Sequence, residues 1–333
     1  MSFQMSVLST LPTLPTLAEL EAGHHIVYEV LRPTPQYTWP LLQERLGTEV
    51  WVKHENHTPT GAFKVRGGLV YFKRLLEREP KCPGVISATR GNHGQSVGYA
   101  ARRCGVPAVI VVPRGNSREK NAAMRALGVE LIEHGADFQE SREHADRLAA
   151  ARGLHFVPSF HRDLILGVSS YCAELLRAVP DLDVMYMPIG QGSGICSMIA
   201  AKLALGHAVE IVGVVSAHAP TYALSFEARR VVEAPVTTQL ADGMACRVPD
   251  ADPLGLIVAH VSRIVRVTDA EVAAAMRALF ADTHNVAEGA GAASLAAALA
   301  ERDRLAGKKV GLTLCGGNVD SDQFARVLTG GTH

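Results

Sequence analysis

The sequence has no excess of charge of either sign. Its 33 Lys and Arg residues balance 33 Asp and Glu residues, and no block of like charges occurs along the 333 positions. A surface that binds nucleic acid or an anionic membrane needs a concentration of basic side chains. The sequence therefore predicts neither partner, and a small neutral or zwitterionic ligand fits it better.

Cysteine is sparse, and long apolar runs are missing. The six cysteines include no Cys-x-x-Cys pair, which argues against a zinc ribbon, a redox dithiol or a disulfide scaffold and favours a reducing cytoplasm. The first 31 residues lack Lys and Arg and include Pro12 and Pro15, so they do not resemble a signal peptide. No apolar run is long enough to span a membrane. The cysteines are Cys82, Cys104, Cys172, Cys196, Cys246 and Cys315.

What the sequence does contain is a regular alternation of two patterns. Apolar residues make up 47% of the chain, enough for a large core. From Gly47 onward, short β-branched runs alternate with amphipathic stretches, which predicts an α/β fold with parallel sheets covered by helices on both faces. We expect strands at 50–53, 85–88, 108–112, 129–133, 185–188, 211–215 and 310–314. We expect helices at 92–103, 118–127, 138–151, 195–205 and 270–281, with glycines just past helix ends at Gly105, Gly128, Gly153 and Gly206.

Lys64, in the segment TGAFKVRGG at 60–68, is the strongest candidate for a reactive side chain. A lysine amine is protonated at neutral pH, but a desolvated one loses its charge and can form a Schiff base with an aldehyde. The small and apolar residues before Lys64 predict desolvation, and Arg66 adds a second positive charge, so we expect a lowered pKa. The alternative is a surface lysine at the start of a helix.

A glycine-rich turn, GQGSG, lies between an apolar run at 184–188 and a helical stretch. Its glycines allow backbone N–H groups to converge, and the following helix N-terminus favours a phosphate. The spacing departs from Gly-x-Gly-x-x-Gly and no acid is suitably placed, so a nicotinamide site is not indicated. The alternative is a plain tight turn. The residues are Gly190, Gln191, Gly192, Ser193 and Gly194, and the Ser193 hydroxyl could add a phosphate contact.

Two further segments, SATRGNHG at 87–94 and TLCGGN at 313–318, complete a set of four in fixed order. Together they resemble the serine/threonine dehydratase-like family, the fold type II or β-family of pyridoxal-phosphate enzymes, from about Thr34 to about Asp320. The resemblance implies two open parallel-sheet lobes with the active site between them. It implies a large cofactor-binding domain of 1–83 and 162–333, a small mobile domain of 84–161, and a homo-oligomer, dimer or tetramer.

The resemblance also implies roles for individual residues. Lys64, next to Phe63, would hold pyridoxal 5'-phosphate and later remove the substrate's Cα proton, and the GQGSG turn would hold the phosphate. Asn92 would bond the cofactor's ring hydroxyl, while Gly243 and Glu288 would line the ring. The loop that receives the substrate carboxylate would be Thr89, Arg90, Gly91, Asn92 and His93. Asn92 could instead be a helix N-cap, and Glu288 could cap a helix or form a local salt bridge.

Cys315 matches the Ser or Cys that faces the pyridine nitrogen in this family. A neutral thiol there would not protonate the ring, which favours prompt loss of a β-leaving group over a long-lived carbanion. Otherwise Cys315 is a small buried hydrophobe. Arg90 is a departure, because related racemases carry a serine there as their second acid/base. An arginine does not accept a proton at working pH, so racemisation by that route is disfavoured.

No metal site is expected. Some family members bind a cation through acids after the strand that corresponds to 211–215, and the sequence there reads SAHAP, without an acid. His24 and His25, or His54 and His57, lack a suitably spaced carboxylate or cysteine, which favours packed or solvated histidines.

The sequence therefore predicts a pyridoxal-phosphate ammonia-lyase. We expect dehydration and deamination of a 3-hydroxy amino acid such as serine, threonine, 3-hydroxyaspartate or phenylserine, giving a 2-oxo acid and ammonia. Alternatives are an amino-acid racemase, a lyase for another β-leaving group, or a non-catalytic cofactor-binding regulatory protein. Because the sequence ends soon after Cys315, we expect no additional regulatory domain and no feedback by isoleucine.

Overall fold

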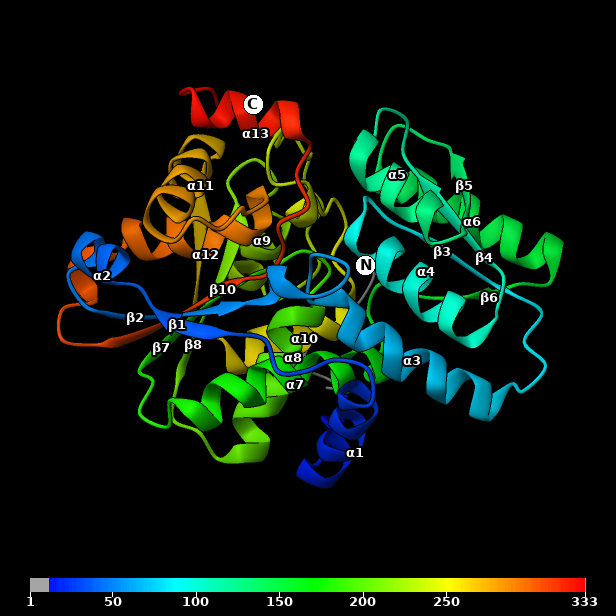
Figure 1. Cartoon of the computed structure of the whole chain (residues 1–333), viewed down its shortest axis with the longest axis horizontal. Coiled ribbons are helices and arrows are strands. Elements are labelled where there is room, and N and C mark those ends of the chain that lie inside the picture. Colours follow the sequence, from blue (N-terminus) through cyan, green and yellow to red (C-terminus); the bar gives the residue numbers. More distant parts are fainter. Residues whose placement is uncertain (1–11, 333) are drawn as a thin grey trace, which may run out of the picture.

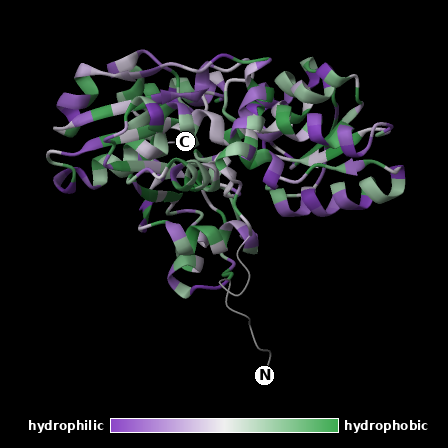
Figure 2. Ribbon diagram, turned by 90° about the horizontal axis from the view of Figure 1, so that it is seen from below, coloured by the Kyte–Doolittle hydropathy of each residue, from purple (hydrophilic) through white to green (hydrophobic). Residues whose placement is uncertain are grey.

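The computed structural model describes residues 12–332, which form an α/β protein with ten strands in two sheets (Figure 1). The two sheets and their helices lie side by side as a larger and a smaller body (Figures 1 and 2). Residues 1–11, at the start of the stretch compared above with a signal peptide, lie outside the described part. Within residues 12–332, no helix is both long and apolar enough to cross a membrane.

The larger sheet has six strands in the order β1-β2-β10-β7-β8-β9. All neighbours are parallel except the edge pair β1 and β2, which is antiparallel. The strands are β1 (Gln36–Thr38), β2 (Glu49–His54), β7 (Val184–Pro188), β8 (Glu210–Ser216), β9 (Arg263–Val267) and β10 (Lys309–Leu314). Side chains alternate between the two faces, because Val184 and Tyr186 of β7 enter one core while Met185 and Met187 enter the other.

Helices cover both faces of this sheet, as a parallel sheet requires. One core contains α1 (Leu17–Tyr28), α7 (Arg162–Ala178), α8 (Ser193–Leu205), α9 (Thr221–Ala228) and α10 (Ala251–His260). The opposite core contains α2 (Pro40–Leu46), α11 (Asp269–Thr283), α12 (Gly289–Ala300) and α13 (Ser321–Leu328). Three short 3₁₀ turns lie in the connections between these strands and helices. They are η1 (Glu55–His57), η2 (Asp242–Met244) and η3 (Arg302–Arg304).

The smaller sheet is parallel throughout, with the order β5-β4-β3-β6. Its strands are β3 (Val85–Ala88), β4 (Ala108–Val112), β5 (Glu130–Glu133) and β6 (His155–Phe156). On one face pack α4 (Asn92–Cys104) and α5 (Arg118–Ala126), and on the other packs α6 (Phe138–Arg152).

The helix α3 (Lys64–Arg78) belongs to both bodies. Val65, Leu69 and Val70 in its first half pack into the core shared with α7 and α8. Tyr71 and Phe72 in its second half pack into the core of the smaller sheet. One continuous helix therefore joins the two bodies, and its first residue, Lys64, lies where they meet.

The expected α/β architecture with mainly parallel sheets is confirmed. All seven expected strands and all five expected helices are present, with ends within two residues of those predicted. The four glycines expected at helix ends have positive φ values between 63° and 87°. The strands β1, β6 and β9 and the remaining helices were not placed from sequence, because β1 and β6 have three and two residues and β9 is interrupted by Arg266.

Candidate active site

One cavity lies between the two bodies, and it encloses about 820 Å³ of space when its open mouth is included. The structure brings every residue predicted above to bind cofactor or substrate onto its wall. These are Phe63, Lys64, Thr89, Arg90, Gly91, Asn92, His93, Gly190, Gln191, Gly192, Ser193, Gly194, Gly243, Glu288 and Cys315. The fold explains the convergence, because the loops at the carboxyl ends of β3, β7 and β10 all face this cavity.

Four helices begin at the cavity wall. The first residues of α3, α4 and α8 are Lys64, Asn92 and Ser193, and Glu288 is the N-cap of α12. Helix N-termini present unpaired N–H groups and a partial positive charge. The cavity therefore favours a ligand that carries negative groups.

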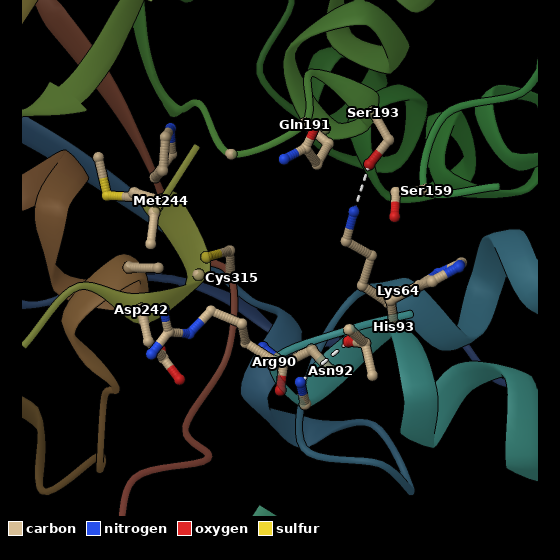
Figure 3. Close-up of a pocket in the computed structure, with 18 of the residues that line it drawn as sticks. Lys64, Arg90, Asn92, His93, Ser159, Gln191, Ser193, Asp242, Met244 and Cys315 are labelled. Carbon is tan, nitrogen blue, oxygen red and sulfur yellow. Dashed lines mark hydrogen bonds between the residues drawn. The ribbon is translucent and has the colours of Figure 1, made fainter. Parts of the chain in front are cut away.

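The Lys64 amine is buried and points toward α8 (Figure 3). Its Nζ lies 2.5 Å from Ser193 Oγ and 5.0 Å from the centre of the Phe63 ring. Burial lowers the pKa of Lys64 to about 8, opposed weakly by the Cys315 thiol. The lowered pKa raises the fraction of this amine that is neutral near physiological pH, and the neutral amine is the state that attacks an aldehyde or accepts a proton.

The expected contribution of Arg66 to this pKa is wrong. Arg66 is fully buried, and its guanidinium binds Glu55 at 2.7 Å and Glu174 at 2.7 Å. Residues two apart on a helix do not share a face, so Arg66 points away from Lys64 and its charge is already neutralised. Desolvation alone lowers the pKa of Lys64.

The turn before α8 requires glycine for close packing. A Cβ on Gly190 would lie 2.3 Å from the carbonyl oxygen of Gly243, and a Cβ on Gly192 would lie 2.5 Å from Cβ of Pro253. Gly192 also has φ +89°, a left-handed conformation that favours glycine, and it caps α8 with no side-chain acceptor. The first amides of α8 and the Ser193 hydroxyl therefore remain available to an anion.

The loop after β3 is ordered by the Thr89 hydroxyl. Its Oγ1 accepts hydrogen bonds from the amides of Gly91 at 2.9 Å and Gly94 at 3.3 Å. Gly91, rather than Asn92, is the N-cap of α4, and it offers no side-chain acceptor. The interpretation of Asn92 as an N-cap is therefore wrong.

Asn92 instead belongs to a polar network that the sequence did not predict. Its Nδ2 donates to Glu288 Oε1 at 2.5 Å, and its Oδ1 accepts from Asn318 at 2.9 Å. Lys120, from the smaller body, lies 2.7 Å from Asp242 and 3.0 Å from the second oxygen of Glu288. Lys120 stands in no glycine-rich segment, so no local signal marked it.

This network holds two acids, Asp242 and Glu288, and one cation, Lys120. Burial by itself lowers the pKa of Lys120, but Asp242 and Glu288 outweigh burial and raise that pKa above its usual value. Burial raises the pKa of Glu288, and Lys120 and Asn92 oppose that change. A protonated Lys120 beside these two acids therefore forms a polar contact between the two bodies.

The segment after β10 is tied directly to the Lys64 segment. The Phe63 amide donates to the carbonyl of Cys315 at 3.1 Å, and Ala62 forms an antiparallel bridge with Gly316. Burial raises the pKa of the Cys315 thiol, which keeps it neutral. Lys64 and Cys315 are thereby held at a fixed separation on one wall of the cavity.

His93 and Arg90, from the loop after β3, also line the cavity. Burial and the nearby Lys64 lower the pKa of His93 to about 3, so its ring is neutral, and its Nε2 has no hydrogen-bond partner in residues 12–332. Arg90 is half-buried, and its Nε is enclosed without a partner in the same described part. Phe138 and Ser159 also line the cavity and had no signal in the sequence.

The histidines weighed above as metal ligands have other partners or lie exposed. His24 Nε2 lies 2.9 Å from Ser169 Oγ, and His54 Nε2 accepts from the Trp39 indole at 3.0 Å. His57 contacts Asn285 at 2.8 Å, and His25 is exposed. Among residues 12–332 there is no group of three or more His, Cys, Asp or Glu side chains that could hold a metal ion.

Comparison with known proteins identifies the family. The family model for pyridoxal-phosphate dependent enzymes matches residues 27–316. The chain belongs to this family. The pyridoxal-phosphate dependent enzymes most similar to it include an L-threonine ammonia-lyase of Thermotoga maritima, 33% identical over 95% of this chain and 78% of the relative.

Two further members of the family are informative. The L-threo-3-hydroxyaspartate ammonia-lyase of Saccharomyces cerevisiae is 32% identical over 93% of this chain and 95% of its own length. The crystal structure of a pyridoxal 5'-phosphate-dependent aspartate racemase superposes with a TM-score of 0.88 at 28% identity, covering 94% of this chain and 99% of that one. The expected family and the expected fold are confirmed, and the protein is a pyridoxal-phosphate enzyme of the threonine dehydratase type.

The cavity suits the cofactor of this family. A buried amine of low pKa can take an aldehyde, the glycine turn and the start of α8 can take a phosphate, and neutral Cys315 can face a pyridine nitrogen. No acid on the wall is placed to repel the phosphate, since Asp242 and Glu288 both contact Lys120. The residues present therefore fit pyridoxal 5'-phosphate.

Proposed function

We propose that this protein dehydrates a 3-hydroxy amino acid, and that water then hydrolyses the dehydrated product to the corresponding 2-oxo acid and ammonia. The observation that supports this most strongly is the buried Lys64 amine, whose lowered pKa of about 8 suits both an attack on an aldehyde and removal of a proton. The two ammonia-lyase relatives act on hydroxylated amino acids by name and match nearly the whole chain.

The residues of this chain divide the work as follows. Pyridoxal phosphate, when bound, supplies the aldehyde that captures the substrate amine and the ring that delocalises charge from Cα. Phe63 packs beside the Lys64 amine and keeps it desolvated, while the turn from Gly190 to Gly194, with Ser193, would hold the phosphate. Lys64 Nζ accepts the Cα proton.

The opposite wall would bind the substrate. The amides of Asn92 and His93, the first two of α4, have no partner from residues 12–332 and would receive the α-carboxylate. Asn92 and Glu288 would contact the cofactor's ring hydroxyl, and Gly243 would pack along the ring. Cys315 would face the ring nitrogen as a neutral group.

Racemisation is the second candidate, because the aspartate racemase superposes closely on this chain. A racemase needs a proton donor and acceptor on the face opposite Lys64. Arg90 comes from the opposite wall, and a guanidinium does not exchange a proton at neutral pH (Figure 3). Elimination requires the Lys64 base and a proton for the leaving hydroxyl, but no second acid/base on the face opposite Lys64.

The experiment is a substrate panel. Purified holoenzyme would be given isomers of serine, threonine, 3-hydroxyaspartate and phenylserine, with 2-oxo acid, ammonia and change of chirality measured together. Equal release of oxo acid and ammonia from at least one substrate supports the proposal. Racemisation without release of oxo acid would favour the second candidate. If no oxo acid is released and no chirality changes, the protein would be non-catalytic.

We further propose that 84–161 acts as a mobile small domain that closes on a large domain of 1–83 and 162–333. Contacts between the two that closure would form or break support this, notably those of Lys120 with Asp242 and Glu288. A homo-oligomer, dimer or tetramer, is supported by exposed Tyr37 and Leu41 near the edge strand β1. Light scattering of the purified protein would measure the oligomer.

A cytoplasmic location is supported by all six cysteines being free thiols.

A further inference from the structure

Arg90 is a cation in the cavity without a counter-charge. Its side chain runs from the loop after β3 into the cavity, away from the Lys64 amine (Figure 3). No ion pair or hydrogen bond joins its side chain to any residue of 12–332, and its Nε is enclosed without a partner. A guanidinium carries a positive charge and N–H donors, so the enclosed Nε of Arg90 favours an anionic partner.

The acids near Arg90 are already engaged. Asp242 and Glu288 both contact Lys120. Asp137, which lines an adjoining hollow, lies 2.9 Å from Arg247. None of these three acids forms an ion pair with Arg90 within residues 12–332, so its guanidinium remains open to a ligand.

A substrate's α-carboxylate does not require this charge. The N-terminus of α4 presents the amides of Asn92 and His93 without side-chain or backbone acceptors in the described residues. These amides and the helix field can hold one carboxylate, as they would for any amino acid. The guanidinium of Arg90 is an additional set of donors, and it matches a second carboxylate.

Space for a second carboxylate lies next to Arg90. Arg90, Phe138, Gln191 and Ala245 line both the main cavity and the hollow, so the two spaces adjoin at these residues. A substituent on Cβ of the substrate could extend from the main cavity into this hollow. An apolar substituent would leave the cation unpaired there.

From this arrangement we infer that Arg90 determines substrate specificity by binding a carboxylate on the β-carbon, so that the substrate is a 3-hydroxylated amino dicarboxylic acid of the 3-hydroxyaspartate class. The inference rests on the proposed function and names its substrate. It assigns Arg90 to the side chain of the substrate, while the α-carboxylate is left to α4. Charge-assisted hydrogen bonds predict a preference of about 10- to 100-fold for the acidic substrate over a neutral isostere.

Aspartate and asparagine provide the matched pair of ligands, because they have the same size and neither carries the β-hydroxyl. Their dissociation constants would be measured on the holoenzyme from the change in the cofactor's visible absorption. The variants are Arg90→Gln, Arg90→Lys, and Arg142→Gln as a control that removes a positive charge from a rim pair with Asp250. Rates of 2-oxo acid release from 3-hydroxyaspartate and from serine would be measured on the same samples.

We expect the parent protein and Arg142→Gln to prefer aspartate by at least about 10-fold. Arg90→Gln loses the preference by weakening aspartate alone, and Arg90→Lys keeps part of it because the charge remains without the planar fork. An equal loss for both ligands would mean that Arg90 binds the α-carboxylate and would overturn the inference, as would unchanged constants. Absence of 2-oxo acid from every substrate, with the aspartate preference intact, would overturn only the proposed reaction.

Discussion

The Lys64 amine and the Ser193 hydroxyl, 129 positions apart in the chain, lie 2.5 Å from each other. Lys64 is the first residue of α3 and Ser193 the first residue of α8, so the reactive amine adjoins the turn that would hold phosphate. A ligand that carries both an aldehyde and a phosphate can therefore contact both at once. The packing of α3 against α7 and α8 in one core maintains this arrangement.

Gly192→Ala should weaken cofactor binding and destabilise the protein. The new Cβ would meet Pro253 at 2.5 Å, and φ of +89° strains any residue with a Cβ. We expect a loss of roughly 2 to 4 kcal/mol in unfolding free energy and a clear rise in the cofactor dissociation constant. Urea unfolding and equilibrium dialysis would measure both.

Gly206→Ala is the matched control for this variant, because Gly206 ends the same helix. It has φ of +63°, but a Cβ there would meet nothing within 4 Å. We expect a loss of about 1 kcal/mol from backbone strain and no change in cofactor binding. Equal effects of the two substitutions would show that steric closure of the turn is unimportant.

Lys120→Met should destabilise the protein strongly. It leaves the carboxylates of Asp242 and Glu288 without their shared cation, and breaking a buried pair costs roughly 3 to 5 kcal/mol. Arg118→Gln removes a positive charge from the same helix but breaks only an exposed pair with Asp322, so its cost should stay below about 1 kcal/mol. Similar midpoints in denaturant for the two variants would argue against a structural role for the Lys120 network.

The apoprotein should become more stable with Lys64→Met at neutral pH. The folded state lowers the pKa of Lys64 from 10.5 to about 8, so below pH 8 folding carries the full penalty of a buried ammonium. Between pH 8 and 10.5 the unfolded chain binds the proton that the folded chain has released, and stability rises with pH across that window. The variant should therefore gain on the order of 1 to 3 kcal/mol at pH 7, and the gain should shrink as the pH approaches 10.5. Denaturant titrations of both apoproteins at pH 7 and pH 10 would measure the difference in unfolding free energy between the variant and the parent. A difference that widens with pH would contradict the lowered pKa of Lys64.

Cys315→Ser should retain most of the activity, because a hydroxyl replaces a thiol that burial keeps neutral. Cys315→Asp would place a carboxylate in the same buried position, where Glu288 already adds negative charge, and should lower stability by roughly 2 to 4 kcal/mol and suppress turnover. Cys104→Asp introduces the same group at an exposed helix end and should cost about 1 kcal/mol or less. Thermal unfolding and oxo-acid release would compare the three, and a Cys315→Asp enzyme of normal stability and rate would remove the argument for a neutral group.

Parts of the site could be predicted because their residues stand in short segments that form glycine-rich turns between a strand and a helix. The glycines of 190–194 and the strand-to-helix turn at 87–94 are visible in the sequence for that reason. Lys120 was missed because its role depends on Asp242 and Glu288, which are more than 120 positions away. Arg66 was misread because sequence proximity to Lys64 suggested repulsion, whereas the helix turns it toward Glu55 and Glu174.

The central claim is that one amine, that of Lys64, holds the cofactor and performs the proton transfer. Borohydride reduction of the holoenzyme, followed by proteolysis and mass spectrometry, would locate the pyridoxyl group directly on the chain. We predict modification of Lys64, with Lys53 and Lys120 unmodified because each is buried in an ion pair. A pyridoxyl group on any other lysine, or on none while the protein remains active, would contradict the account.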